Sequence, residues 1–216
     1  ARIGNWPDAL ALENGEDFLE ALKVGKGVSP REMLFVQPNG ELGALSSGFV
    51  SMVPTMYQFD SFGYHRLLRQ GLYPGEAESW GWLLDERWRG RTVLTVHAPI
   101  AIVEMALASQ ARGLMRFDDI GNLQIHEIDQ LIDMLIDYKR RGHFRAFWET
   151  SVQAGALLRS GEVRVGSMWP GAATETGDNN IVMAVPAEGT RAWMIGLSIS
   201  AKCKGEQLER AYAFIN

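Results

Sequence analysis

Strand-like and helical patterns alternate through the second half of the chain. The β-branched stretch 91–96 predicts a buried strand, since such side chains pack well in a sheet. The stretches 162–168 and 180–186 have the same strand-like composition, and 194–200 follows as a further run. Strands that alternate with helices are typical of an α/β domain with a largely parallel sheet.

Helices are predicted between these strands. Pro99 is expected in the first turn of a helix that ends at Gly113. The clearest helix covers 126–141, where an apolar stripe repeats at helical spacing and basic residues fill the last turn before Gly142. The stripe consists of Ile128, Leu131, Ile132, Leu135 and Ile136. Further helices are expected at 14–24, 79–84, 151–159 and 206–216.

The region around residue 50 has a strand-like pattern as well. Two strand segments, 49–54 and 61–64, are predicted there, with a turn between them at Tyr57-Gln58. The earlier stretches 25–30 and 38–48 are rich in Gly, Ser and Pro, which favours loops.

Two tryptophans are predicted at the ends of strand-like runs. Trp169 follows 162–168 and precedes the turn residues Pro170-Gly171, and Trp193 follows the second run. Ligands of open α/β sheets bind beyond the carboxyl ends of strands. Indole offers a broad apolar face, one N–H donor and attraction for cations. The chain has seven Trp, so a place in the core and a place in a ligand site both remain open for these two.

The composition excludes several classes of function. The net charge of −5 argues against nucleic acid as a partner, because phosphate binding needs a basic surface. No apolar run approaches the roughly 20 residues of a membrane span. Cys203 is the single cysteine, so no internal disulfide can form. There is no phosphate loop and no metal-binding spacing of histidines, so we expect no cofactor and no metal.

The two ends of the chain suggest a portion of a longer protein. Residues 1–6 lack the basic and apolar pattern of a signal peptide, and 206–216 is predicted as a helix still in progress.

From about residue 50 to the end, a set of short segments occurs in a recognisable order and spacing. The segments are Val53-Pro54 with Gly63-Tyr64-His65, Glu78 to Leu84 with Arg87 to Arg91, Gly161-Glu162-Val163 with Trp169-Pro170-Gly171, Val185 to Gly189, Ala192 to Leu197, and Ala211 to Asn216. This ordered set resembles the extracellular solute-binding proteins of ABC transporters, of the spermidine/putrescine-binding type.

The resemblance implies a type II periplasmic-binding-protein fold. Such proteins have two α/β lobes with mixed, mostly parallel sheets, joined by crossing strands and closing on the ligand by hinge motion. This chain is expected to contain mainly the second lobe. Residues 1–60 are assigned to a partial first lobe and a crossing segment, 61–190 to the second lobe, and 191–216 to a crossing segment that returns to the first lobe.

The resemblance also implies the ligand-binding residues. Trp169, Trp193 and Tyr57 are expected as aromatic walls, with polar contacts from Asp60, His97, Ser151 and Arg191. Acidic positions of the family are replaced here, one of them by Ile195 and another near His97. Burying an unpaired ammonium group costs several kcal/mol, so these replacements disfavour a long diamine or triamine.

Arg191 and His97 favour an anionic end on the ligand instead. Glu149 and Glu175 are further charged candidates beside Asp60. We therefore expect a small organic ligand that is polyamine-like, a monoamine or an amino-acid derivative.

The expected function is that of a monomeric, periplasmic, non-enzymatic component of an ABC importer that delivers its ligand to a membrane permease. One alternative is an enzyme on the same fold with Cys203 as its nucleophile. The other is a ligand sensor that docks on a receptor.

Overall fold

The computed structural model describes residues 53–68, 74–175, 177, 180–197, 199–200 and 202–215, together with four two-residue strands nearer the N-terminus. The chain divides into two compact units. One is Phe59–Ala192, and the other joins Ala1–Gln58 to Trp193–Asn216. Within the described part of the chain, no helix combines the length and the apolar character needed to cross a membrane.

A mixed sheet is built from the strands β5 (Val53–His65), β6 (Thr92–Thr95), β7 (Phe144–Trp148), β8 (Val165–Met168), β9 (Ile181–Met183) and β10 (Arg191–Leu197). Strands β6, β7, β8 and β9 lie within the unit Phe59–Ala192, and β5 and β10 continue beyond the bounds of that unit. The order across the sheet is β10-β5-β8-β6-β7, and β9 also pairs with β5. Strand β6 runs parallel to β7 and β8, whereas β5 is antiparallel to β8 and β9. The α/β fold expected from the sequence is confirmed.

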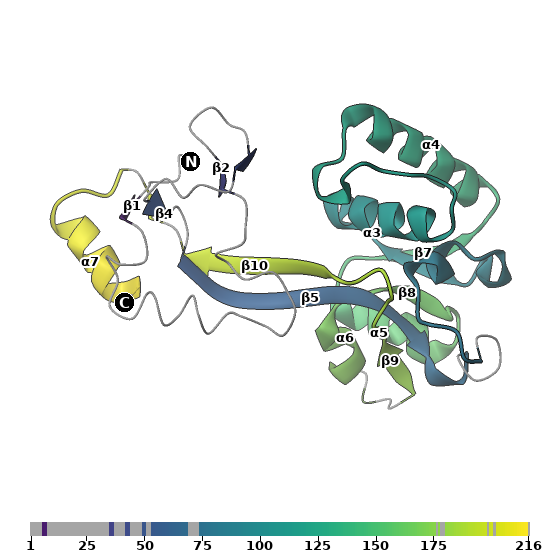
Figure 1. Cartoon of the computed structure of the whole chain (residues 1–216). Coiled ribbons are helices and arrows are strands. Elements are labelled where there is room, and N and C mark those ends of the chain that lie inside the picture. The colour runs from purple at the N-terminus through teal and green to yellow at the C-terminus, as the bar shows by residue number, and fades with distance from the viewer. Residues whose placement is uncertain are drawn as a thin grey trace. The chain divides into compact units, whose positions relative to one another are not determined.

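Helices cover both faces of this sheet. Helices α3 (Ala98–Ala111) and α4 (Ile125–Arg140) lie on one face, and α5 (Ser151–Ser160) and α6 (Pro170–Glu175) lie on the other (Figure 1). Short 3-10 helices form at η3 (Trp80–Leu84), η4 (Glu86–Trp88) and η5 (Ile120–Asn122). Because β6, β7 and β8 are each followed by a helix, this part of the unit is built from β–α segments that return to the same sheet.

Local signals define the ends of these helices. The side chain of Thr150 accepts a hydrogen bond from Gln153 N–H and so caps α5, which ends at Gly161 with a φ of 75°. Helix α4 begins with a capping box and stops before Gly142, whose φ is 72°. These two helices confirm the predicted segments 151–159 and 126–141.

The core forms one apolar cluster on each face of the sheet. On the α3 face, Phe62 and Trp80 are fully buried with ring centroids 5.5 Å apart. On the α5 face, Leu158 and Met168 pack around the strands. Gly166 lies where strands β6 and β8 approach each other closely. A Cβ at this position would lie 2.8 Å from the carbonyl oxygen of Val93. The close approach of these two strands therefore requires glycine.

Two of the short segments noted in the sequence analysis, Glu78 to Leu84 and Val185 to Gly189, pack against each other. The hydroxyl of Ser79 donates to the carboxylate of Glu188 at 2.5 Å, and the Trp80 N–H donates to the same carboxylate at 3.2 Å. The indole N–H of Trp80 donates to the carbonyl of Gly189 at 2.8 Å. Glu188 thus accepts hydrogen bonds from donors at the start of η3, although it lies more than one hundred residues later in the chain.

Two sequence predictions are wrong. The predicted turn at Tyr57-Gln58 does not exist, because β5 is one continuous strand and no Gly or Pro interrupts it there. Trp193 lies within β10 rather than at the end of a run. The apolar stripe of α4 is present and partly buried, since Leu131 is fully enclosed whereas Ile132 and Ile136 are exposed. Strand β7 was not predicted at all.

The other unit contains short strands and one helix in its described residues. Strand β1 (Trp6–Pro7) pairs with β4 (Phe49–Val50), and β2 (Phe35–Val36) pairs with β3 (Leu42–Gly43), both antiparallel. Helix α7 (Glu206–Ile215) confirms the predicted helix at 206–216. The predicted helix at 14–24 lies outside the described residues, and the assignment of lobes to residue ranges stays a prediction.

Candidate ligand site

Three parallel strands end at the same edge of the sheet, and a helix begins beyond each. Strand β6 ends at Thr95 before α3, β7 ends at Trp148 before α5, and β8 ends at Met168 before α6. This edge is where open α/β sheets place their ligands. The side chains that follow these three strands are therefore the first candidates for a site.

Three rings from these strand ends form an aromatic cluster of His97, Trp148 and Trp169. The imidazole of His97 stacks on the indole of Trp169, with centroids 5.5 Å apart and planes at 19°. Trp148 meets Trp169 edge to face at 4.9 Å. Trp148 is buried, whereas His97 and Trp169 are half-buried. The cluster thus presents two partly accessible rings on a buried third.

Hydrogen bonds fix the buried ring in place. The indole N–H of Trp148 donates to the carbonyl oxygen of Ser167 at 2.9 Å and lies 3.1 Å from its hydroxyl oxygen. The Thr95 N–H donates to the same hydroxyl oxygen at 2.9 Å. On the accessible side, Nε2 of His97 lies 3.2 Å from the carbonyl oxygen of Glu149. Backbone from three strand ends therefore holds the aromatic cluster.

A buried polar cluster of Asp60, Glu104, Ser167 and Arg191 adjoins this edge. Arg191, the first residue of β10, forms an ion pair with Asp60 of β5. The Asp60 side chain is 1% exposed and that of Arg191 is 16% exposed. Glu104 of α3 is also 1% exposed, and its carboxyl group hydrogen-bonds with Ser167. Ser167 is thus shared between the polar cluster and the support of the aromatic cluster.

The environment of Glu104 changes its ionisation. Burial is the main cause that raises the pKa of Glu104 to about 8. The charge of Asp60 raises this pKa further, whereas Arg191 and the Ser167 hydrogen bond act in the opposite direction. At neutral pH Glu104 is therefore mostly protonated, and the charge of Arg191 is balanced by Asp60.

The structure brings several of the predicted site residues together. His97 and Trp169 stack on each other, and Asp60 and Arg191 form an ion pair. Ser151 is the half-buried first residue of α5. Trp193 is half-buried in β10 and belongs to the other unit. The side chains of Tyr57 and Glu175 lie outside the described residues, so their roles stay predictions.

Sequence reasoning missed Trp148 and Glu104. Trp148 ends the strand that was not predicted, so no pattern assigned it to the edge. Glu104 had a signal that could have been used, because it is the only charged residue in helix α3, whose other residues are mostly apolar. An isolated carboxyl on an apolar helix face is unusual, since burial of a charged group is costly.

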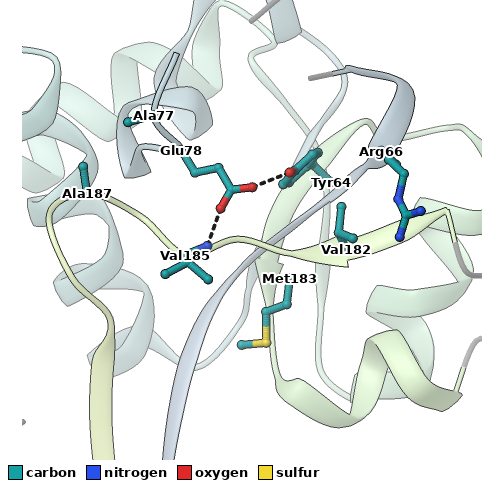
Figure 2. Close-up of a pocket in the computed structure, with 8 residues that line it drawn as sticks. All are labelled: Tyr64, Arg66, Ala77, Glu78, Val182, Met183, Val185 and Ala187. Carbon is teal, nitrogen blue, oxygen red and sulfur yellow. Dashed lines mark hydrogen bonds between the residues drawn. The ribbon is translucent and has the colours of Figure 1, made fainter. Parts of the chain in front are cut away.

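A separate pocket of about 570 Å³ opens near Tyr64, at the opposite edge of the sheet. In Figure 2 the carboxylate of Glu78 lies between two donors, the hydroxyl of Tyr64 and the backbone N–H of Val185. The wall is otherwise mostly apolar, with Arg66 at one side (Figure 2). Because Glu78 ties the segment after β9 to β5, we assign these contacts a structural role.

Solved structures share the fold of this chain. The substrate-binding protein of a spermidine/putrescine ABC transporter from Streptococcus pneumoniae aligns with a TM-score of 0.61 and 15% identity, over 99% of this chain and 56% of that one. An ABC transporter substrate-binding protein from Bradyrhizobium japonicum has a TM-score of 0.53 and 17% identity, over 76% and 47% of the two chains. The lipoprotein Tp0655 of Treponema pallidum has a TM-score of 0.51 and 15% identity, over 76% and 48%.

At these identities the solved structures establish the fold alone. The chain spans 56% of the length of the pneumococcal protein, so it corresponds to part of such a molecule. No curated protein sequence matches it. The family model for bacterial extracellular solute-binding proteins, however, matches residues 56–216. Because that match covers most of the 216 residues, the chain belongs to the bacterial extracellular solute-binding protein family.

Proposed function

We propose that this chain captures a small organic solute and presents it to the membrane permease of an ABC importer. The observation that carries the proposal is the aromatic cluster of His97, Trp148 and Trp169 at the carboxyl ends of three parallel strands. The family is named for solute binding and not for catalysis, which supports a non-enzymatic role. The protein would act outside the cytoplasm, as the family description indicates.

The chemistry of the edge suits a small polar molecule with an apolar face. Half-buried rings such as Trp169 stabilise a flat or apolar part of a ligand, and His97 adds a ring nitrogen for hydrogen bonding. Ser151 contributes a hydroxyl at the start of α5. The anchoring of Trp148 to Ser167 keeps these groups in place before the ligand arrives, which lowers the entropic cost of binding.

Calorimetry and thermal unfolding with a panel of solutes test this proposal. The panel contains polyamines, amino acids, amino-acid derivatives and sugar alcohols. A true ligand at ~100 times its dissociation constant stabilises the protein by about 2.7 kcal/mol. If no member of the panel binds or stabilises the full chain, the proposed capture of a small organic solute is contradicted.

A variant pair ties binding to the aromatic cluster. Trp169→Ala should weaken the binding of any ligand found by at least tenfold, because a stacking ring contributes roughly 1.4 kcal/mol or more. The control is Phe214→Ala, which removes an aromatic ring that is 80% exposed on α7. If both variants bind the ligand as tightly as the wild type does, the aromatic cluster is not part of the ligand site.

A further inference from the structure

We infer that Arg191 determines the charge of the accepted ligand: its guanidinium neutralises Asp60 from within the fold, so the site takes a polar solute without net positive charge, either uncharged or zwitterionic. This inference rests on the proposed function and narrows the ligand class.

The ion pair between Arg191 and Asp60 is the first step of the argument. The Asp60 side chain is 1% exposed, so its carboxylate needs a partner inside the fold. Arg191 supplies that partner from β10, the strand next to β5 in the sheet. A cationic ligand would therefore compete with a guanidinium that is already in place and fixed by the backbone. Displacing the guanidinium from Asp60 would leave the positive charge of Arg191 poorly paired, on a side chain that is only 16% exposed to water.

Glu104 is the second step, because it is the other carboxyl group that a cation could use. The groups that face Glu104 are Asp60 from β5, Arg191 from β10 and Ser167 from β8. Burial, with a smaller contribution from the charge of Asp60, outweighs the opposing effects of Arg191 and Ser167 and raises the pKa of Glu104 to about 8, so this carboxyl group is mostly neutral at pH 7. The polar cluster then holds one positive and one negative charge.

The third step links this balance to the ligand site. Ser167 hydrogen-bonds with Glu104 and accepts from Thr95, and the indole N–H of Trp148 reaches the same residue. The polar cluster thus lies directly behind the aromatic cluster. Glu149 is an acidic residue on the accessible side, and its side chain is exposed, where water and salt weaken its attraction for a cation.

Three solutes with one carbon skeleton form the core of the test. Calorimetry on the full chain at pH 7 compares 1,4-diaminobutane, 4-aminobutyrate and butane-1,4-diol, alongside spermidine, neutral amino acids and sugar alcohols. Binding of uncharged or zwitterionic members, at least tenfold tighter than that of either polyamine, is the expected result. Preferential binding of a polyamine overturns the inference and leaves the proposed function intact. Absence of all binding contradicts the proposed function itself.

The variant Arg191→Gln gives an independent readout. Removal of the guanidinium leaves the Asp60 carboxylate available, so 1,4-diaminobutane should raise the melting temperature of this variant and not that of the wild type. The control Arg145→Gln removes a surface partner of Glu162 and should give no such gain. If Arg191→Gln does not fold, the double variant Asp60→Asn/Arg191→Gln removes both charges; it should fold and still ignore the diamine. Stabilisation of that double variant by the diamine would refute the role of the ion pair.

A pH series completes the test. Above pH 8 Glu104 ionises and the polar cluster gains a net negative charge, so the wild type should begin to bind 1,4-diaminobutane there. Glu104→Gln should abolish this gain. Diamine binding that is equally weak at pH 7 and pH 9 would show that the charge of this cluster does not govern selection.

Discussion

Glu104→Gln should change how the stability of the protein depends on pH. In the folded protein the pKa of Glu104 is raised from its ordinary value of 4.5 to about 8, mainly by burial. The folded state therefore binds a proton that the unfolded chain releases between these two values. Stability falls as pH rises through this window, and the loss is complete above pH 8. Glutamine has a similar shape and does not ionise, so the variant should lack this part of the pH dependence.

The magnitude follows from the width of the window. From pH 4.5 to pH 7 the span is 2.5 pH units, and each unit corresponds to about 1.4 kcal/mol. The wild type should thus lose about 3 kcal/mol from this group by pH 7, to an order of magnitude. Glu104→Gln should be close to the wild type in stability at pH 5 and more stable by a few kcal/mol at pH 8.

Urea unfolding followed by tryptophan fluorescence at pH 5, 6, 7 and 8 measures this difference. The control is Glu162→Gln, whose side chain is half exposed and pairs only at the surface with Arg145. The control should differ from the wild type by a small and constant amount across the series. A constant difference for Glu104→Gln, or one that decreases as pH rises, would refute the reasoning.

Two further substitutions test how the unit is held together. Gly166→Ala places a Cβ 2.8 Å from the carbonyl oxygen of Val93, so strands β6 and β8 must separate. We expect the free energy of unfolding in urea to fall by about 1–3 kcal/mol. A variant as stable as the wild type would contradict this packing. Glu188→Ala removes the acceptor for Ser79 and Trp80 at the start of η3 and should cost about 1–2 kcal/mol, whereas unchanged melting would show that this contact is not needed.

Elements with strong local signals could be predicted from the sequence. Helix α5 has the Thr150 cap at one end and Gly161 at the other, and α3 has Pro99 in its first turn. Strand β7 could not be predicted because it follows directly on the basic end of α4. Strand β7 forms because it pairs with the fully buried strand β6, and this pairing joins residues that are distant in the sequence.

The candidate site was predicted in part for a similar reason. Trp169 and His97 follow strands, so the rule for strand ends applied to them. The pair of Asp60 and Arg191 joins residues 131 positions apart, and no spacing in the sequence encodes it. Residue type alone makes both charges candidates for ligand contact, but in the structure they form an ion pair with each other. Three-dimensional proximity, and not residue type, decided their role.

The antiparallel pairing of β5 has a consequence for the order in which the protein is made. Ser61 pairs with Met168 and Gly63 with Met183, so both partner residues are synthesised more than 100 residues after the residues of β5 that they pair with. Until then the strand has no partner from β8 or β9. Such distant pairing slows folding and prolongs the time during which the strand stays unpaired. A truncation before residue 165 would remove both neighbours and leave the strand open to aggregation.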